Sequence, residues 1–297
     1  MPPKTLDELR NLVNQIHTGE AELSLGPRAF QTLARLIDEP RQAAVYSITD
    51  LAANLGINAS TLTRLAKRLG YRGFNELQDI FRHFVASGQT YFYSHQVDRI
   101  VHPTHGGQKT MEVFLEVVGD ETRNIQKLSK EVDPQLLNDA TQLLCTARNV
   151  RIHGLRQFYS LANFFSYGLG LIRDRVSILG EAGHGVAHSL SQLNEDDALV
   201  VMGCNPYTRA TVDAGRIASK YGIPVLAFTD SSASPLAGNS HYTVVIPSTG
   251  RFYVNSTAAW SVLLEGLLTL VARRLGDDAI TTLKTRERLF NELGITI

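Results

Sequence analysis

The second half of the chain alternates between short β-branched apolar runs and longer stretches in which apolar residues recur at helical spacing. This alternation strongly constrains the fold, because consecutive strands separated by helices pair in parallel through right-handed crossovers. We predict strands at Val150–His153, Val176–Leu179, Ala198–Met202, Pro224–Phe228 and Tyr242–Ile246. Helices are predicted up to Ile172, over Val186–Leu193, from Thr208 to Tyr221 and from Ser256 to Leu275. The pattern predicts a five-stranded parallel sheet covered on both faces, a flavodoxin-like three-layer α/β domain.

The first 85 residues have only the helical pattern. Thr5 and Glu8 have the spacing of a capping box, and apolar residues follow at helical spacing. A second periodic stretch ends at Pro40. Five short helices are expected, near residues 5–16, 27–37, 48–55, 58–69 and 77–85. This part of the chain is therefore predicted to be a separate all-α domain.

Between the two patterns, residues 86–110 carry turn formers and little sustained periodicity, which is typical of a linker. Two helices are expected after it, near Met111–Leu128 and Pro134–Thr146. The predicted organisation is a helical domain at 1–85, a linker and connecting helix at 86–124, an α/β domain at 125–285 and a C-terminal tail at 286–297.

Residues 48–69 have the pattern of a helix-turn-helix. A helix over Ile48–Leu55 ends at Gly56, Ile57 can fill the space between two helices, and Asn58 can cap the second helix. The chain has 29 basic and 29 acidic residues, so any attraction to DNA must come from a local patch. From Asn58 to Phe74 there are four cations and no carboxylate.

In a helix-turn-helix the second helix enters the major groove, where early residues reach base edges and flanking cations bind phosphates. We predict that Ser60, Thr61 and Arg64 read bases. Lys67, Arg68 and Arg72 are better placed for phosphates. Asn58 and Thr63 complete the predicted DNA-binding set.

Residues 5–80 resemble the N-terminal domain of the RpiR (MurR/RpiR) family of bacterial transcriptional regulators. The resemblance is carried by SITDLAANLGINASTLTRLAKRLGYRGFNEL, residues 47–77. Family members usually have Ser at the position of Asn58 and Phe at the positions of Leu65 and Tyr71, which are mild departures. The resemblance implies sequence-specific binding of double-stranded DNA.

In an open parallel sheet, ligands bind beyond the carboxyl ends of the strands, where loops meet helix N-termini. The loops at these positions are rich in hydroxyls, and two of them carry an arginine, a combination that suits a small anion. The candidate effector-binding residues are Arg156, Ser160, Tyr207, Thr208, Arg209, Thr211, Asp230, Ser231, Ser234 and Ser256.

Residues 125–280 resemble the sugar isomerase (SIS) domain that forms the C-terminal half of RpiR-type regulators. The phrase from Thr229 to Ala237, TDSSASPLA, is the best-matched part. The resemblance implies a phosphosugar ligand, but Arg156 stands where many SIS domains have a small residue and Gly203 where Ser is common. With Arg209, Arg156 could instead hold a sugar acid or another carboxylate. The resemblance also implies a homodimer or homotetramer, and a two-fold assembly predicts a palindromic operator.

Two other functions remain open. The α/β domain could only dimerise, or it could be a sugar-phosphate isomerase, which needs a positioned base such as Glu or His. The loops show no clear carboxylate–histidine pair, so we predict no enzyme activity. Cys145 and Cys204 are too few for a disulfide scaffold or a cysteine-based zinc site, and we predict no metal and no cofactor. The N-terminus lacks the apolar core of a signal peptide, and we predict a cytoplasmic protein without membrane contact.

Overall fold

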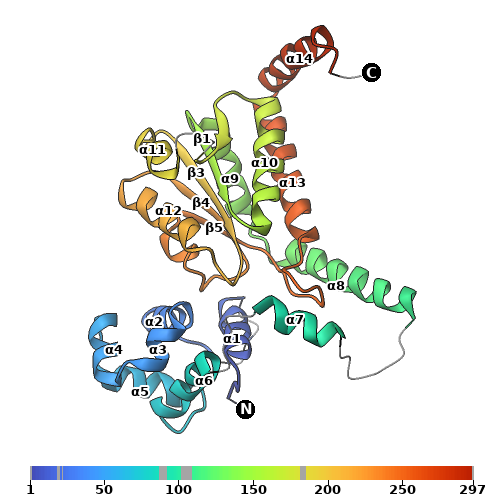
Figure 1. The fold of residues 1–297 in the computed structure, drawn as a ribbon. Coiled ribbons are helices and arrows are strands. Elements are labelled where there is room, and N and C mark those ends of the chain that lie inside the picture. The colour runs from blue at the N-terminus through green and yellow to red at the C-terminus, as the bar shows by residue number, and fades with distance from the viewer. Residues whose placement is uncertain are drawn as a thin grey trace. The chain divides into compact units, whose positions relative to one another are not determined.

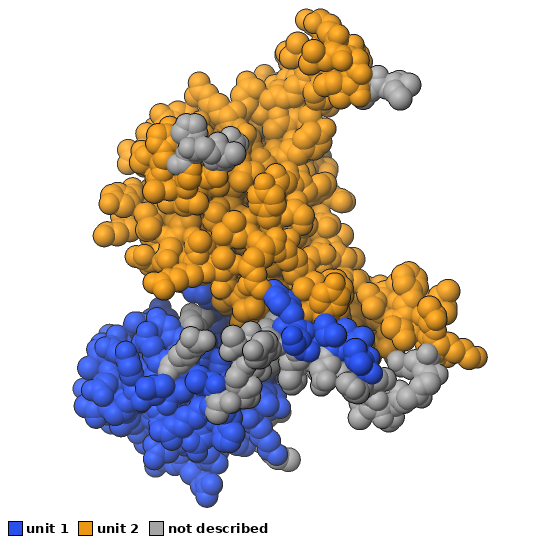
Figure 2. All heavy atoms as spheres, in the orientation of Figure 1, with its two compact units in different colours: residues 1–102, 231–238 blue, residues 103–230, 239–297 orange. Residues whose placement is uncertain are grey.

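The structure is a computed structural model and describes residues 2–18, 21, 23–86, 92–101, 109–180 and 185–295. The chain divides into two compact units, residues 1–102 with 231–238 and residues 103–230 with 239–297, coloured separately in Figure 2. Below, the helical unit means residues 1–102 and the α/β unit means residues 103–230 with 239–297.

The helical unit contains seven helices in its described part (Figure 1). They are α1 (Leu6–Thr18), α2 (Pro27–Asp38), α3 (Pro40–Val45), α4 (Ile48–Leu55), α5 (Ala59–Arg68), α6 (Phe74–Ala86) and α7 (Phe92–Val101). Their core is made of apolar side chains from α1 to α6, among them the fully buried Leu9, Leu33, Leu36, Leu62, Leu77 and Phe81. The expected all-α domain is confirmed.

The expectation of five helices before residue 86 was wrong, because the structure has α3 as a sixth. The sequence pattern places a helix end at Pro40, but Pro40 lies in the first turn of α3, where its missing N–H is not needed. The helix is fixed by α6, since the buried Gln78 side chain donates to the carbonyls of Ala43 (2.9 Å) and Tyr46 (2.8 Å). Likewise, α7 lies in the stretch predicted to be a linker.

The α/β unit contains a five-stranded, fully parallel sheet of order β2-β1-β3-β4-β5. The strands are β1 (Val150–Gly154), β2 (Val176–Ile178), β3 (Ala198–Gly203), β4 (Val225–Thr229) and β5 (Tyr242–Val245). Its helices are α8 (Thr110–Glu131), α9 (Pro134–Thr146), α10 (Gln157–Ile172), α11 (Gly185–Ser191), α12 (Arg209–Lys220), α13 (Ala258–Leu275) and α14 (Asp277–Glu292). In Figure 1, α9, α10 and α13 cover one face of the sheet and α11 and α12 the other, so the three-layer α/β prediction is confirmed.

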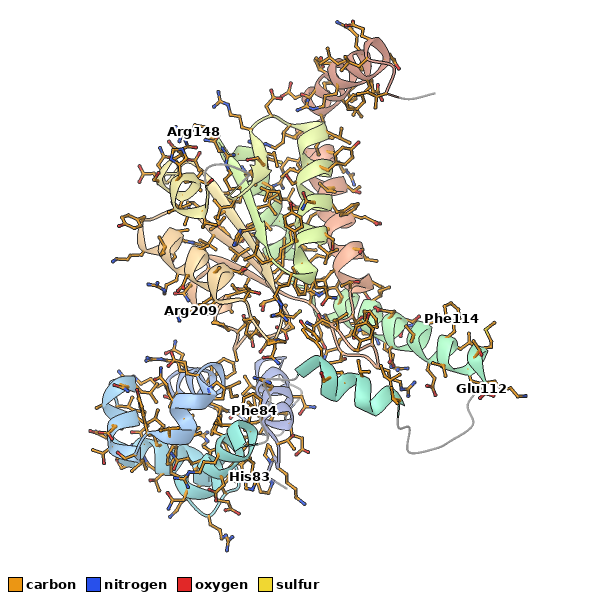
Figure 3. All side chains as sticks on the ribbon, in the orientation of Figure 1. His83, Phe84, Glu112, Phe114, Arg148 and Arg209 are labelled. Atoms are coloured by element: carbon orange, nitrogen blue, oxygen red, sulfur yellow. The ribbon has the colours of Figure 1, made fainter. Side chains whose placement is uncertain are left out.

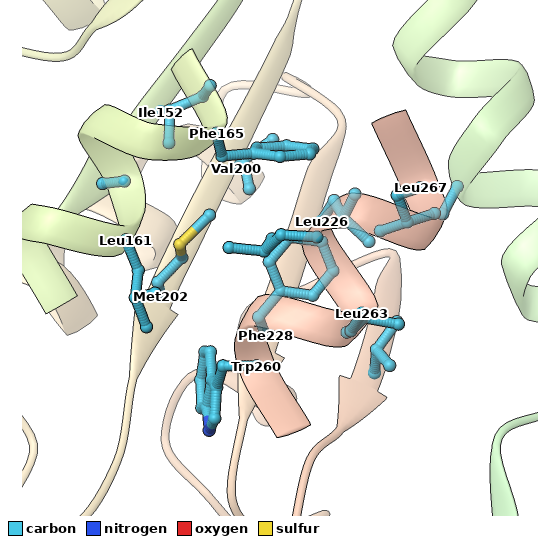
Figure 4. Packing of buried hydrophobic residues seen from close by; sticks show 14 of the residues in the cluster. Ile152, Leu161, Phe165, Val200, Met202, Leu226, Phe228, Trp260, Leu263 and Leu267 are labelled. Atoms are coloured by element: carbon cyan, nitrogen blue, oxygen red, sulfur yellow. The ribbon is translucent and has the colours of Figure 1, made fainter. Parts of the chain in front are cut away.

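The core of the α/β unit lies between the sheet and α9, α10 and α13 (Figure 4). Phe165 and Phe228 meet edge to face, with ring centroids 6.0 Å apart. Trp260 is fully buried against Phe158, and its indole N–H donates to Ser248 Oγ at 2.7 Å. Each such side chain contributes about 1.5–3 kcal/mol on burial. Phe158 and Trp260 lie in the first turns of α10 and α13, so this packing joins the two helix starts that follow loops at the carboxyl edge of the sheet.

The predicted domain borders remain predictions. Helix α8 runs through the proposed border at residue 124, and α14 runs through the one at residue 285. None of the helices in the described part of the chain combines the length and the apolar character that crossing a bilayer requires.

Candidate DNA-binding surface and effector site

Helices α4 and α5 meet through a turn built on glycine. Gly56 adopts the left-handed conformation (φ 67°, ψ 33°), which ends α4 and reverses the chain. The Ser47 hydroxyl caps α4 by accepting a hydrogen bond from the Asp50 N–H at 3.2 Å. Asn58 has the extended backbone of an N-cap residue, but its side chain makes no capping hydrogen bond, contrary to the prediction. The helix-turn-helix geometry itself is present.

One face of α5 is buried and the other carries the predicted DNA contacts. Leu62, Leu65 and Ala66 pack into the helical core. Ser60, Arg64 and Lys67 are exposed and four and three residues apart, so they form one stripe along the helix. Asn58, Arg68 and Arg72 are also exposed, and Thr61 and Thr63 are half-buried.

Two hydrogen bonds and one ion pair involve the predicted DNA-contacting side chains of this surface. Arg64 Nη2 lies 3.4 Å from Thr61 Oγ1, so two of the three proposed base-reading side chains contact each other. Thr63 Oγ1 bonds back to the Ala59 carbonyl at 3.4 Å. The Arg72 side chain is 93% exposed and pairs with Glu76 at 3.5 Å. Glu76 lies just beyond the acid-free sequence window, and it reduces the positive charge at that end of the surface.

At the carboxyl edge of the sheet, the structure joins the loop after β1 to the loops after β3 and β4. Arg156 Nη1 donates to the Pro206 carbonyl at 3.1 Å. The Asp230 carboxylate accepts from the Tyr207 hydroxyl at 2.6 Å and from the Asn205 N–H at 3.2 Å. Three of the predicted effector residues, Arg156, Tyr207 and Asp230, are therefore connected through the segment 205–207.

The loop before α13 belongs to the same network through two amide side chains that the sequence reading missed. Asn255 Nδ2 donates to the Asn205 carbonyl at 3.2 Å, and the Asn255 N–H donates to Gln157 Oε1 at 3.3 Å. Neither residue type is distinctive at a loop start, and only the order of the strands brings these loops together.

Arg156 has an unusual backbone. Its φ of 58° and ψ of −125° lie in a region that favours glycine, and it occupies the residue before α10. Such a conformation costs on the order of 1–3 kcal/mol and is found mainly at functional sites. Its side chain is exposed at the ligand edge of the sheet.

Most of the other predicted effector residues have local bonds of their own. Ser160 bonds to the Gln157 carbonyl at 2.9 Å, and Arg209 is 95% exposed and lies 3.5 Å from Asp213. Thr208 stands at the N-cap of α12 without a side-chain capping bond. Ser231 Oγ accepts from the Ala233 N–H at 3.1 Å, and Ser234 Oγ accepts from the Ala237 N–H at 3.0 Å.

Ser256 and Thr211 are both buried. The Ser256 hydroxyl donates to a Glu121 carboxylate oxygen and accepts from Asn124 Nδ2 at 2.8 Å, so it anchors α8. Thr211 Oγ1 is one of three buried side-chain polar atoms without a hydrogen-bond partner in the described residues. The bonds of Ser256 give it a structural role, whereas the structure shows no bond for the Thr211 hydroxyl. Effector binding by either residue stays a prediction.

Of the titratable side chains beside the described strands, His153 and Cys204 lie near this edge, whereas His241 precedes β5 at the opposite, amino edge of the sheet. Burial lowers the pKa of His153, which keeps its ring neutral. His241 Nδ1 accepts the Val225 N–H at 3.0 Å and is therefore used by the sheet. Burial raises the pKa of Cys204, which keeps it a thiol. Among the described residues, no three His, Cys, Asp or Glu side chains come together as a metal site would require.

The two units thus define a class of protein that joins a helix-turn-helix domain to a separate α/β domain with a parallel sheet. Residues 11–85 match the model of the helix-turn-helix domain of the rpiR family, and residues 143–272 match the SIS domain. The chain belongs to the RpiR family of transcriptional regulators. The resemblance seen in the sequence is confirmed.

Known relatives support this assignment along nearly the whole chain. The HTH-type transcriptional regulator HexR of Pseudomonas aeruginosa is 26% identical over 280 residues, which cover 91% of this chain and 92% of HexR. The sugar isomerase domain of an RpiR transcription factor from Sphaerobacter thermophilus is 26% identical with a TM-score of 0.56, and it covers 59% of this chain and 97% of that one. The Vibrio vulnificus NanR protein complexed with ManNAc-6P shares the fold over 95% of this chain and 99% of its own, at 18% identity and a TM-score of 0.57.

Proposed function

We propose that this regulator recognises its operator through α5 and is controlled by a small anionic metabolite bound at the carboxyl edge of the sheet. Ser60, Thr61 and Arg64 read bases in this proposal, and Lys67 and Arg68 bind phosphates. The stripe of exposed polar and basic side chains on α5 supports these roles.

The observation that carries the effector site is Arg156. A positive φ is costly for any residue other than glycine, and at Arg156 the residue that carries this cost has its guanidinium at the ligand edge of a parallel sheet. Guanidinium groups bind carboxylates and phosphates through paired hydrogen bonds. The proposed ligand class is therefore a phosphosugar, a sugar acid or a similar carbohydrate derivative.

We further propose that the protein acts as a homodimer or homotetramer on a palindromic operator, in the cytoplasm. Effector binding would change operator affinity only if the ligand prefers one of the two states of the assembly. A role in regulation rather than catalysis agrees with the name of the HexR relative. It also agrees with the lowered pKa of the buried His153 and with the hydrogen bond that His241 accepts from the Val225 N–H.

A thermal-shift screen tests the effector proposal. The purified protein would be heated with phosphosugars, sugar acids and simple carboxylates, and a ligand at a hundred times its dissociation constant should add about 2.7 kcal/mol of stability. Arg156→Ala should lose this shift. Arg216→Ala, which removes an exposed arginine paired with Asp213 on α12, is the matched control and should keep it.

Either result of this screen is informative. A shift that survives in Arg156→Ala would contradict the proposed site. The absence of any shift across the panel would favour the alternative function, in which the α/β unit serves only to dimerise.

A further inference from the structure

The segment Pro2–Lys4 lies against the turn that follows the proposed recognition helix. The Tyr71 hydroxyl donates to the Pro3 carbonyl at 2.8 Å. A Cβ atom on Gly70 would lie 3.5 Å from Pro2 Cβ, so Pro2 packs on that turn. Gly70 and Tyr71 come directly after α5 and its cap residue, Leu69.

The segment is held in place on its other side as well. The Lys4 N–H donates to Glu8 Oε2 at 2.7 Å, and the Glu8 N–H donates to Thr5 Oγ1 at 3.1 Å. Two consecutive prolines fix φ near −65° and favour an extended chain. The backbone at Pro3 and Lys4 is thus bonded to both α1 and the turn after α5.

Tyr71 is suited to this role. It is 5% exposed, and burial, with the charges of Glu8 and Glu76, raises its pKa, so its hydroxyl stays protonated and remains a donor. Lys4 itself is exposed. The tie through Tyr71 therefore brings an exposed cation to the end of α5, where Arg68 and Arg72 are also exposed.

We infer that Pro2–Lys4 is a second DNA-contacting element, in which Lys4 binds a backbone phosphate beside those bound by the end of α5. This inference rests on the proposed operator binding by α5. Contacts to phosphates position a protein on the duplex and add affinity for every sequence, and short arms next to a recognition helix are well placed to make them.

The local charge allows such a contact. Glu8 and Glu76 lie near Tyr71, but the Glu8 carboxylate is bonded to the Lys4 N–H, and Glu76 is bonded to the Arg72 backbone and side chain. The exposed cations Lys4, Lys67, Arg68 and Arg72 outnumber these two acids.

The test measures binding of the full chain to a duplex selected from a random library by the unmodified protein, over a series of salt concentrations. Lys4→Gln should weaken binding roughly three- to tenfold near 0.1 M salt, equally for selected and random duplexes, and should reduce the salt slope by about 1. Lys220→Gln, which removes the same charge from the end of α12, should change neither quantity.

A double-mutant cycle tests whether the hydrogen bond from the Tyr71 hydroxyl to the Pro3 carbonyl positions Lys4 for DNA binding. Tyr71→Phe keeps the ring but releases Pro3, so it should weaken binding alone and have no further effect together with Lys4→Gln. The thermal midpoint of each variant separates this result from partial unfolding. In hydroxyl-radical footprints of the selected duplex, both variants should lose protection only at the backbone positions that flank those bound by α5.

The outcomes are distinct. If Lys4→Gln behaves like Lys220→Gln, Pro2–Lys4 does not contact DNA and the inference is overturned. If the effects of Lys4→Gln and Tyr71→Phe simply add, the Tyr71 hydrogen bond does not position Lys4, and that part of the inference is overturned. If the unmodified protein selects no duplex at all, the proposed operator binding itself is contradicted.

Discussion

Replacing Asp197 with asparagine should destabilise the α/β unit by about 2–4 kcal/mol. The Asp197 carboxylate is completely buried at the turn before β3. It accepts a paired hydrogen bond from Arg148 at 3.0 and 2.8 Å and further bonds from the backbone N–H groups of Asn149 and Asn194. An asparagine amide would place a donor against one of these donors. Figure 3 shows Arg148 beside the edge of the sheet where this cluster lies.

The pKa of Asp197 gives the magnitude of the charge contribution. Burial raises this pKa, but the hydrogen bonds from Arg148, Asn194 and Asn149 outweigh burial and lower it from 3.8 to about 2. A shift of that size corresponds to about 2.4 kcal/mol at neutral pH. Because the pKa is lower in the folded state, this stability is complete above the unfolded-state value. It is lost as the pH falls, to about 0.4 kcal/mol near pH 2.

The assay uses the single tryptophan of the chain. Trp260 is buried in the α/β core, so its fluorescence during urea unfolding reports on that unit. Asp213→Asn is the matched control, since Asp213 makes only half-exposed ion pairs with Arg209 and Arg216 and should change stability by less than about 1 kcal/mol. The reasoning is refuted if Asp197→Asn is no worse than the control, or if its effect is the same at pH 3 as at pH 7.

Three further predictions concern other parts of the molecule. Arg64→Ala should reduce the discrimination between bases by about 1–3 kcal/mol, whereas Lys67→Ala should weaken binding to all duplexes and reduce the salt slope by about 1. If salt titrations show the same loss of discrimination and the same slope for both variants, these roles are contradicted. Gly154→Ala should destabilise the α/β unit by about 2–4 kcal/mol in urea unfolding, because its Cβ would lie 2.6 Å from the Phe158 carbonyl oxygen; a neutral result would mean that the backbone can move. Cys204 should react with a thiol reagent only as fast as the protein unfolds, since the thiol is buried and its pKa is raised; fast labelling of the native protein would disprove this.

The sequence predicted most of the α/β fold, because its signals are local. Each strand is a short β-branched run, and all five observed strands overlap the predicted ranges, as β1 at Val150–Gly154 illustrates. Helix α3 was missed for a local reason too, since a proline that ends one helix can also start the next.

The contacts within the candidate sites depend on tertiary structure and could not be predicted in the same way. The bond from Arg156 to the Pro206 carbonyl joins residues 50 positions apart, and the bond from Tyr71 to the Pro3 carbonyl joins residues 68 positions apart. Ser256 illustrates the same limit, since a hydroxyl at a helix start suggests a ligand, whereas its bond to Glu121 on α8 joins residues 135 positions apart and appears only in the structure.

The network at the carboxyl edge of the sheet also bears on which ligand the proposed effector site would take. Arg156 supplies a cation from one loop, and Asp230 supplies a carboxylate from another. Neutral donors at Tyr207 and Asn205 hydrogen-bond to that carboxylate. Figure 3 labels Arg209, which lies on the neighbouring helix α12. A ligand that contacts both loops needs an anionic group for Arg156 and a hydrogen-bond donor for Asp230. A sugar acid or a phosphosugar carries both groups, whereas inorganic phosphate or acetate has no hydroxyl-bearing carbon chain to span the two loops. Carbohydrate derivatives should therefore raise the thermal midpoint more than simple anions do when both occupy the site at Arg156 to the same extent. An Asp230→Asn variant should reduce this difference in midpoint between the two ligand classes.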